Sequence, residues 1–157
     1  MPRRPYKKTK TIPDLVYNNY QVAKLINYVM RDGKKSVAEQ VVYKAFEIIK
    51  QKKLSPLQVL STAIDNVAPS HEVKARRVGG ASYLVPMDTP TSRKLFLSLN
   101  WIIEGANLRS NKEFHSFEEK LAVELMEAYE GKGKAVEKKN QIEKLAETNK
   151  AFAHFRW

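Results

Sequence analysis

Apolar residues recur at helical spacing, three or four positions apart, through most of this chain from about residue 19 onward. Six such stretches follow one another, and several of them stop at a glycine or a proline. We expect helices that begin near residues 19, 36, 55, 90, 116 and 134. The fourth is apolar on two faces, so we expect it at the centre of the fold. The sixth has only a thin apolar side and should lie at the periphery.

Polar residues at the expected helix starts support these boundaries. Ser36 with Glu39, and Ser116 with Glu119, have the spacing of capping boxes, in which side chains satisfy free backbone N–H groups. The segment Ser55–Gln58 combines a serine cap, a proline at the first helical position and a glutamine that completes the box. We therefore predict side-chain caps at the second, third and fifth helices.

The segment Val73–Pro86 has a different pattern, because apolar and polar residues alternate on both sides of Gly79–Gly80. Two glycines between alternating runs predict a β-hairpin with a type I′ turn, since both residues can adopt positive φ. A hairpin alone is marginal in water, so we expect this protruding ribbon to lean on the body of the protein or to be ordered by a partner. We also hypothesise that both of its faces are accessible and contact separate surfaces. Its register places Lys74, Arg76 and Tyr83 on one face of the ribbon and Arg77 on the other.

These elements predict a mainly α fold, a single-domain bundle of about six helices with one protruding β-hairpin between helices three and four. A chain of 157 residues is long enough to build one such core. Residues 1–18 contain three prolines and no periodicity, so we expect an extended basic N-terminal arm. Residues 71–88 form the β-ribbon, and residues 150–157 form an aromatic and basic tail.

The net charge of +11 is concentrated in two parts of the chain. Residues 1–35 contain nine Lys and Arg against two Asp and Glu, and residues 71–94 contain five against two. Residues 95–157 balance at ten against ten. Runs of cations without acids indicate a polyanionic partner. RNA fits an arm, a ribbon and helix turns better than DNA does, because no helix-turn-helix, zinc or leucine-zipper pattern is present.

Catalytic, metal and cofactor chemistry has little support in the sequence. The chain has no cysteine, and His71, His115 and His154 lie in separate segments without metal-ligand spacing. Gly33–Ser36 resembles the end of a phosphate-binding loop, but Tyr28 stands where that motif needs glycine. We therefore predict no enzyme activity, no catalytic residues, no metal site and no cofactor.

Aromatic residues beside the cations leave two interpretations open. Tyr83 and the three C-terminal rings, Phe152, Phe155 and Trp157, are placed to stack on bases or ribose. In the alternative interpretation, Phe152 or Trp157 fastens the tail to the core.

Several longer motifs resemble the bacterial-type small-subunit ribosomal protein seven family. The similarity runs in order through the whole chain, and the motifs are Met1–Arg4, Asp32–Ser36, Val73–Gly80, Tyr83–Pro86, Trp101–Glu104 and Asn149–Trp157. The resemblance implies a helical bundle with a protruding β-ribbon. It also implies a structural constituent of the small ribosomal subunit, a primary binder of its ribosomal RNA that nucleates assembly of the head.

Carried over by position, the resemblance implies two sets of site residues. The ribbon tip would approach exit-site transfer RNA at the subunit interface, near the messenger RNA path; it comprises Gly79, Gly80, Ala81, Ser82 and Tyr83. Ribosomal RNA would be held by Arg3, Arg4, Lys7, Lys8, Lys10, Lys34, Lys35, Lys74, Arg76, Arg77, Arg93 and Lys94. The family is usually more basic at Met87–Lys94 and Asn107–Asn111, so fewer RNA contacts are expected there.

The resemblance also implies partners and a location. The partners are small-subunit ribosomal RNA, exit-site transfer RNA, messenger RNA and neighbouring small-subunit proteins, nine and eleven among them, with no membrane. The location is a cytoplasmic ribosome, with an organellar ribosome as the alternative. Three other classes compete with this hypothesis: a different RNA-binding module, a small nucleic-acid enzyme, and a module that binds anionic membranes.

Overall fold

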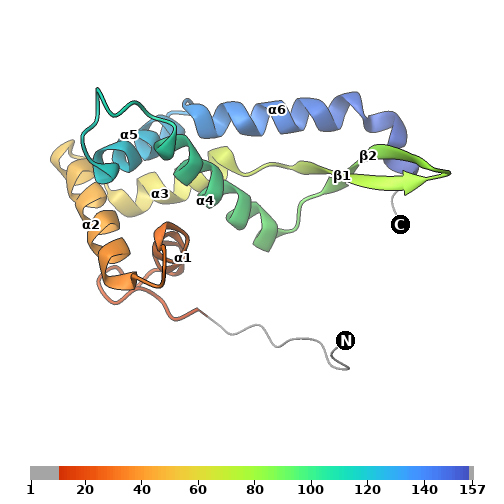
Figure 1. The fold of residues 1–157 in the computed structure, drawn as a ribbon. Helices are drawn as coiled ribbons and strands as arrows, with labels where there is room; N and C mark the ends of the chain where they lie inside the picture. The colour runs from red at the N-terminus through yellow and green to blue at the C-terminus, as the bar shows by residue number, and fades with distance from the viewer. Residues whose placement is uncertain (1–10, 156–157) are drawn as a thin grey trace.

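The computed structural model describes residues 11–155 and is mainly α-helical (Figure 1). A two-stranded antiparallel hairpin lies between the third and fourth helices, so the predicted fold class is confirmed. Residues 1–10 of the predicted arm lie outside the described residues. The elements are, in chain order, α1 (Tyr20–Val29), α2 (Lys35–Gln51), α3 (Pro56–Val67), β1 (His71–Val78), β2 (Ala81–Asp88), α4 (Thr91–Asn107), α5 (Phe117–Tyr129), α6 (Lys134–Thr148) and the 3₁₀ helix η1 (Lys150–Phe155).

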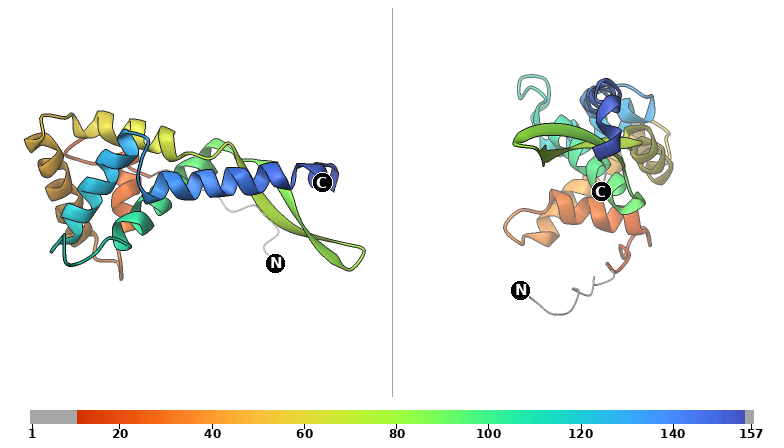
Figure 2. Two further views of the ribbon diagram at one scale, coloured as in Figure 1. Left: turned by 90° about the horizontal axis from the view of Figure 1, so that it is seen from above. Right: turned by 90° about the vertical axis from the view of Figure 1, so that its right-hand side faces the viewer.

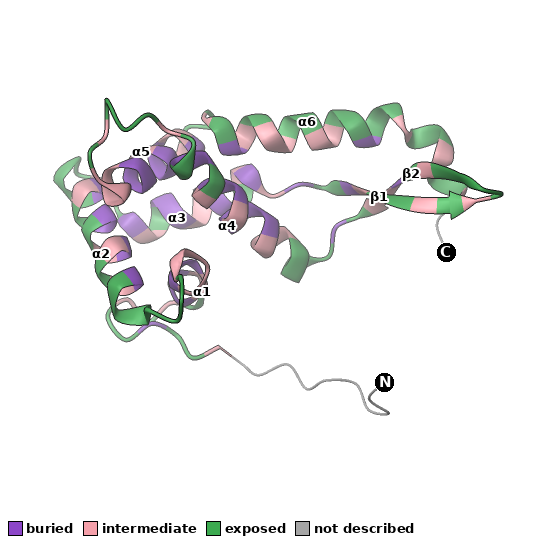
Figure 3. Cartoon of the chain, in the orientation of Figure 1, coloured by how far each residue is buried: buried purple, intermediate pink, exposed green. Residues whose placement is uncertain are grey.

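The helices α4 and α5 pack at the centre of the bundle. α5 contacts α2, α3 and α4, while α4 also contacts α1 and α6. Phe46, Leu99 and Leu125, one from each of α2, α4 and α5, are completely buried in the core between these helices (Figure 3). Leu99 and Trp101 are both buried on roughly opposite sides of α4. This double burial confirms the central position that the two apolar faces of α4 predict.

The helix α6 leaves the bundle and runs toward the ribbon (Figures 1 and 2). It contacts both strands as well as α4, and Ala135 and Ala146 are its buried residues. The prediction of a peripheral sixth helix is therefore confirmed. None of the helices within residues 11–155 has the length and apolar character that crossing a membrane requires.

The ribbon has the register that its glycine pair predicts. Gly79 and Gly80 have φ values of +58° and +91°, and Val78 pairs with Ala81 across them. Positive φ at both central positions is what a type I′ turn needs. The ribbon projects away from the bundle of α1 to α5 beside α6 and η1, and its turn at the far end extends past η1 (Figure 2).

One face of the ribbon is covered, contrary to our prediction. The Tyr83 ring centroid lies 5.1 Å from that of Phe152 and 5.5 Å from that of Phe155. Val85, on the same face of β2, is completely buried. A two-stranded ribbon is marginal without packing, and η1 supplies this packing by folding against β2. The prediction of two accessible faces is wrong, and Phe152 fastens the tail to the ribbon instead of to the helical core.

The helix caps follow the prediction at α5 and depart from it elsewhere. The Ser116 hydroxyl accepts the N–H three residues ahead at 3.4 Å, and the predicted capping box is complete. At α2 the prediction is wrong, because the helix begins at Lys35 with Lys34 as its N-cap, which leaves Ser36 inside the first turn. Ser55 is the N-cap of α3 as predicted, but its side chain makes no capping hydrogen bond.

Candidate nucleic-acid interface

The predicted RNA-binding cations occupy three places in the described structure. The described members are Lys34 and Lys35 at the start of α2, Lys74, Arg76 and Arg77 on β1, and Arg93 and Lys94 in the first turn of α4. The cations predicted in the arm, which are Arg3, Arg4, Lys7, Lys8 and Lys10, lie outside the described residues.

Glu72 brings two of these groups together. Its carboxylate lies 3.2 Å from the Lys74 ammonium on one side and accepts a hydrogen bond from Arg93 Nε at 3.1 Å on the other. The Glu72 side chain is 9% exposed, whereas those of Lys74 and Arg93 remain 51% and 44% exposed. The base of the ribbon and the start of α4 therefore present their cations on one continuous surface. Sequence reasoning missed Glu72, because nothing local marks a carboxylate that pairs with a residue 21 positions away.

The protonation state of Glu72 follows from this geometry. Burial by itself raises the pKa of the carboxyl group, but the hydrogen bonds from Arg93 and Lys74 outweigh burial and lower the pKa below its ordinary value. The group is therefore a carboxylate at neutral pH, and it holds both cations by charge as well as by hydrogen bonding.

Arg93 is also held by an aromatic ring. Its guanidinium carbon lies 4.9 Å from the centroid of Phe96, and Phe96 packs edge-on against Tyr28 of α1 at 5.6 Å. Cation–π contact and the Glu72 bond restrict the direction of a side chain that remains accessible to solvent. A cation fixed in this way loses little conformational freedom when it binds a phosphate.

The two arginines near the ribbon tip differ in environment. Arg76 pairs across the strands with Tyr83 and is partly buried, whereas Arg77 is exposed. Successive residues of a strand point to opposite faces, so Arg77 lies on the face away from η1. The tip residues 79–82 are exposed as well. The face away from η1 is therefore accessible at Arg77, while on the other face Lys74, at the base of the ribbon, remains accessible with its side chain 51% exposed.

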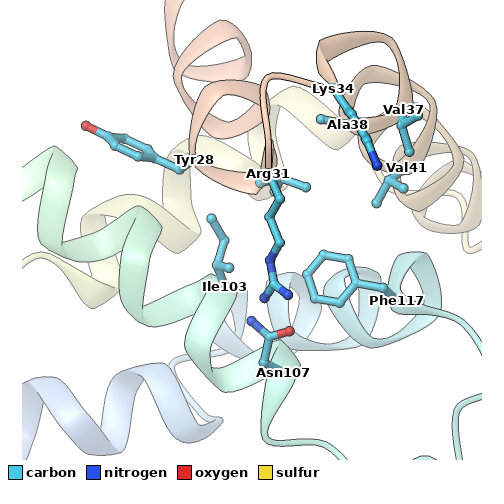
Figure 4. Close-up of a pocket in the computed structure, with 10 residues that line it drawn as sticks. Tyr28, Arg31, Lys34, Val37, Ala38, Val41, Ile103, Asn107 and Phe117 are labelled. Carbon is cyan, nitrogen blue, oxygen red and sulfur yellow. The ribbon is translucent and has the colours of Figure 1, made fainter.

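A pocket at the turn between α1 and α2 contains a cation that sequence reasoning missed. Arg31 and Lys34 line this pocket together with Asn107 of α4 and Phe117 of α5 (Figure 4). The turn itself depends on left-handed backbone, with φ of +72° at Gly33. The available signal was a second cation three residues before Lys34, across the helix end that Asp32–Gly33 predicts.

The segment before α1 is anchored by Asp14. The Tyr43 hydroxyl of α2 donates to one carboxylate oxygen at 2.6 Å, and the N–H groups of Val16 and Tyr17 donate to the other at 3.1 and 2.9 Å. Burial and the negative Asp14 partner raise the pKa of Tyr43 above its usual range, so the hydroxyl remains a donor. This anchor fixes the position at which the chain enters the bundle, beside α2.

The whole chain is similar to known ribosomal proteins. Residues 1–150 match the family described as ribosomal protein S7p/S5e. The proteins named small ribosomal subunit protein uS7 from Caldicellulosiruptor bescii and Caldanaerobacter subterraneus are each 50% identical to it, and the one from Thermosipho africanus is 49% identical. Each alignment covers 100% of both chains. This chain belongs to the ribosomal protein S7p/S5e family.

Membership of the S7p/S5e family confirms the resemblance that the motifs indicated. It assigns the chain to the structural ribosomal proteins, and the prediction that the chain is not an enzyme is confirmed on that basis. Membership of this family implies that the chain is part of a ribonucleoprotein, binds ribosomal RNA and takes part in translation. Within residues 11–155, no cluster of three or more His, Cys, Asp or Glu side chains is arranged to hold a metal ion.

In this S7p/S5e member, the arginine that follows α4, Arg109, is held by hydrogen bonds within the protein itself. Arg109 donates to the Glu124 carboxylate at 2.9 and 2.5 Å and to Glu127 at 3.2 and 2.5 Å. Glu124 is completely buried and also accepts the Ala135 N–H at 3.0 Å. Gly105 makes room for it, since a Cβ there would lie 2.6 Å from Glu124 Oε1. Arg109 therefore ties α4, α5 and the start of α6 together.

Proposed function

We propose that this chain is a structural constituent of the small ribosomal subunit, where it is a primary binder of the ribosomal RNA and nucleates assembly of the head. Family membership supports the ribosomal role. The observation that carries RNA binding is the surface around Glu72, where Lys74 of the ribbon and Arg93 of α4 are held side by side. Lys34 and Lys35 extend the cationic contacts to the start of α2, and Arg77 extends them along β1.

The mechanism is neutralisation of phosphates by cations that the fold holds apart. Each exposed Lys or Arg that reaches a phosphate releases condensed counterions, and this release drives binding. Because the cations lie on α2, on β1 and at the start of α4, they match a folded RNA with phosphates on several sides. Recognition is by shape, and the rigid bundle sets the spacing of the contacts.

In this proposal the ribbon has a second role, which is to contact RNA other than the ribosomal RNA. Its tip, residues 79–83, approaches exit-site transfer RNA at the subunit interface, and neighbouring surfaces border the messenger RNA path. The projection of the ribbon away from the bundle and the exposure of residues 79–82 support this placement (Figure 2). Small-subunit proteins nine and eleven are the proposed protein neighbours, and the cytoplasmic ribosome is the proposed location.

Binding of the full chain to small-subunit ribosomal RNA tests the proposal. Arg76→Ala with Arg77→Ala should weaken binding by roughly tenfold, since each lost charge contact costs about 1 kcal/mol or less at the exposed Arg77 and the partly buried Arg76. The matched control, Lys52→Ala with Lys132→Ala, removes two exposed charges outside the candidate interface and should bind normally. Circular dichroism checks that both variants keep their helices.

Sedimentation of the cellular protein distinguishes the competing classes. The chain should travel with small ribosomal subunits in a sucrose gradient. Travel with membranes, or equal binding by both double variants, would contradict the proposal.

A further inference from the structure

A pocket of about 390 Å³ lies where the turn between α1 and α2 meets α4 and α5 (Figure 4). Its walls are largely apolar, and Val37, Ile103 and Phe117 contribute to them. A volume of this size falls within the roughly 300–1,000 Å³ typical of small-molecule sites. Val37 is 54% exposed at the edge, so the pocket is accessible from solvent.

Polar groups converge on this apolar pocket. The Arg31 side chain extends across it toward Asn107 and Phe117, and the Lys34 ammonium points into it from the start of α2 (Figure 4). None of the ion pairs found among residues 11–155 involves Arg31 or Lys34. The first turn of α2 also contains no acidic residue, which leaves the positive end of the helix dipole uncompensated there.

We infer that this pocket receives one unpaired nucleotide of the small-subunit ribosomal RNA. The base lies against the Phe117 ring and the aliphatic wall, and its edge bonds to the Asn107 amide. The flanking phosphates bind Arg31 and Lys34. The inference rests on the proposed function and adds to it a site that reads a base in addition to the backbone.

General features of RNA recognition favour this occupant. Proteins bind unstacked bases by stacking them on aromatic rings and by hydrogen bonding to their edges. The Asn107 side chain has both an acceptor and donors, so it can pair with either kind of group on a base edge. An apolar peptide segment would fill the walls but leave two cations without partners, whereas a nucleotide supplies an apolar face and a phosphate together.

Filling the pocket without changing charge tests the inference. The probe is small-subunit ribosomal RNA, bound to the full chain in a filter assay. Val37→Trp should occlude the pocket and weaken binding roughly tenfold, the usual effect of losing one stacked base. Ser36→Trp is the matched control, because it introduces the same indole side chain at the neighbouring exposed position, which does not line the pocket. It should bind like the wild type.

A second variant and a base-specific measurement complete the test. Asn107→Ala should weaken binding by several-fold, while Asn140→Ala, on exposed α6 surface, should not. Chemical probing of base edges should reveal one unpaired nucleotide that the wild-type chain protects and that Val37→Trp leaves reactive. Circular dichroism checks that each variant is folded. If Val37→Trp does not fold, Asn107→Ala tests the inference in its place.

Several outcomes would overturn the inference. Normal binding by Val37→Trp and Asn107→Ala, with weakened binding by Arg31→Ala and Lys34→Ala, would show phosphate contacts alone. Normal RNA affinity with lost incorporation of Val37→Trp into subunits would show an apolar protein segment in the pocket. Both leave the proposed function standing, whereas failure of the wild-type chain to bind the RNA would remove the proposed function as well.

Discussion

Glu72 accepts a hydrogen bond from Arg93 with 3.1 Å between Oε2 and Nε, and this bond joins the ribbon to the first turn of α4. The other carboxylate oxygen lies 3.2 Å from Lys74 Nζ. A single carboxylate, almost fully buried, therefore aligns two exposed cations that lie on different elements. The relationship makes Glu72 part of the candidate interface although its own charge is opposite to that of the interface.

Glu72→Gln should lower the free energy of unfolding by about 1–2 kcal/mol at neutral pH. The amide keeps the shape of the side chain but loses the charge that holds Arg93 and Lys74. Both partners are about half exposed, so solvent screening keeps the loss at this modest size. Urea unfolding followed by circular dichroism measures it, with the exposed Asp65→Asn as the control.

The effect of Glu72→Gln should depend on pH with a definite sign. The folded-state pKa of Glu72 lies below its ordinary value of 4.5, so the pair stabilises the folded chain fully above that value. This contribution is lost as pH falls through the lowered pKa. Wild type and variant should therefore converge in acid, and a difference that persists there would show that the ion pair is not its source.

Arg109→Ala should lower the free energy of unfolding by about 3–5 kcal/mol, because it leaves the buried Glu124 carboxylate without its cation. Adding Glu124→Gln should restore part of the loss by removing that charge. Thermal or urea unfolding measures both variants. Lys112→Ala removes an exposed charge from the same loop and should change stability by no more than about 0.5 kcal/mol.

Ribosomal RNA affinity provides the second readout for Arg109. The folded Arg109→Ala chain should bind the RNA as the wild type does, since the side chain is only 11% exposed and contacts two carboxylates. A large loss of affinity without a loss of stability would place Arg109 in the interface.

Phe152→Ala should loosen the ribbon and leave the bundle intact. It removes the ring that packs on Tyr83 at 5.1 Å, and such aromatic pairs contribute about 1 kcal/mol. Amide hydrogen exchange in β1 and β2 should accelerate by roughly fivefold to tenfold, while exchange in α5 stays unchanged. The exposed Leu108→Ala is the control, and unchanged ribbon exchange in Phe152→Ala would show that η1 does not support the ribbon.

Local features of this fold were predictable from the sequence. Gly79 and Gly80 determine the turn through their own backbone freedom, and strand register follows from the turn. The helices follow from their apolar spacing. The same Ser-x-x-Glu pattern predicted the cap correctly at Ser116 and wrongly at Ser36, because the N-cap of α2 is Lys34, which directly follows the turn at Gly33 and lies two residues before Ser36.

Contacts between distant segments were not predictable in the same way. Packing of the tail on Tyr83 depends on where α6 ends in space, which no local pattern specifies. The joining of two cationic groups by Glu72, and the meeting of Arg31 with Asn107, likewise depend on how whole elements pack. The candidate site was therefore predicted as separate cations, and its continuity came only with the tertiary structure.

The salt dependence of binding to small-subunit ribosomal RNA tests the central claim most directly. If the cations on α2, β1 and α4 bind phosphates together, log affinity of the full chain should fall against log salt with a slope of several units, at about 0.7–0.9 per neutralised phosphate. Arg76→Ala with Arg77→Ala should reduce that slope by roughly one to two. A wild-type slope near zero would contradict the account.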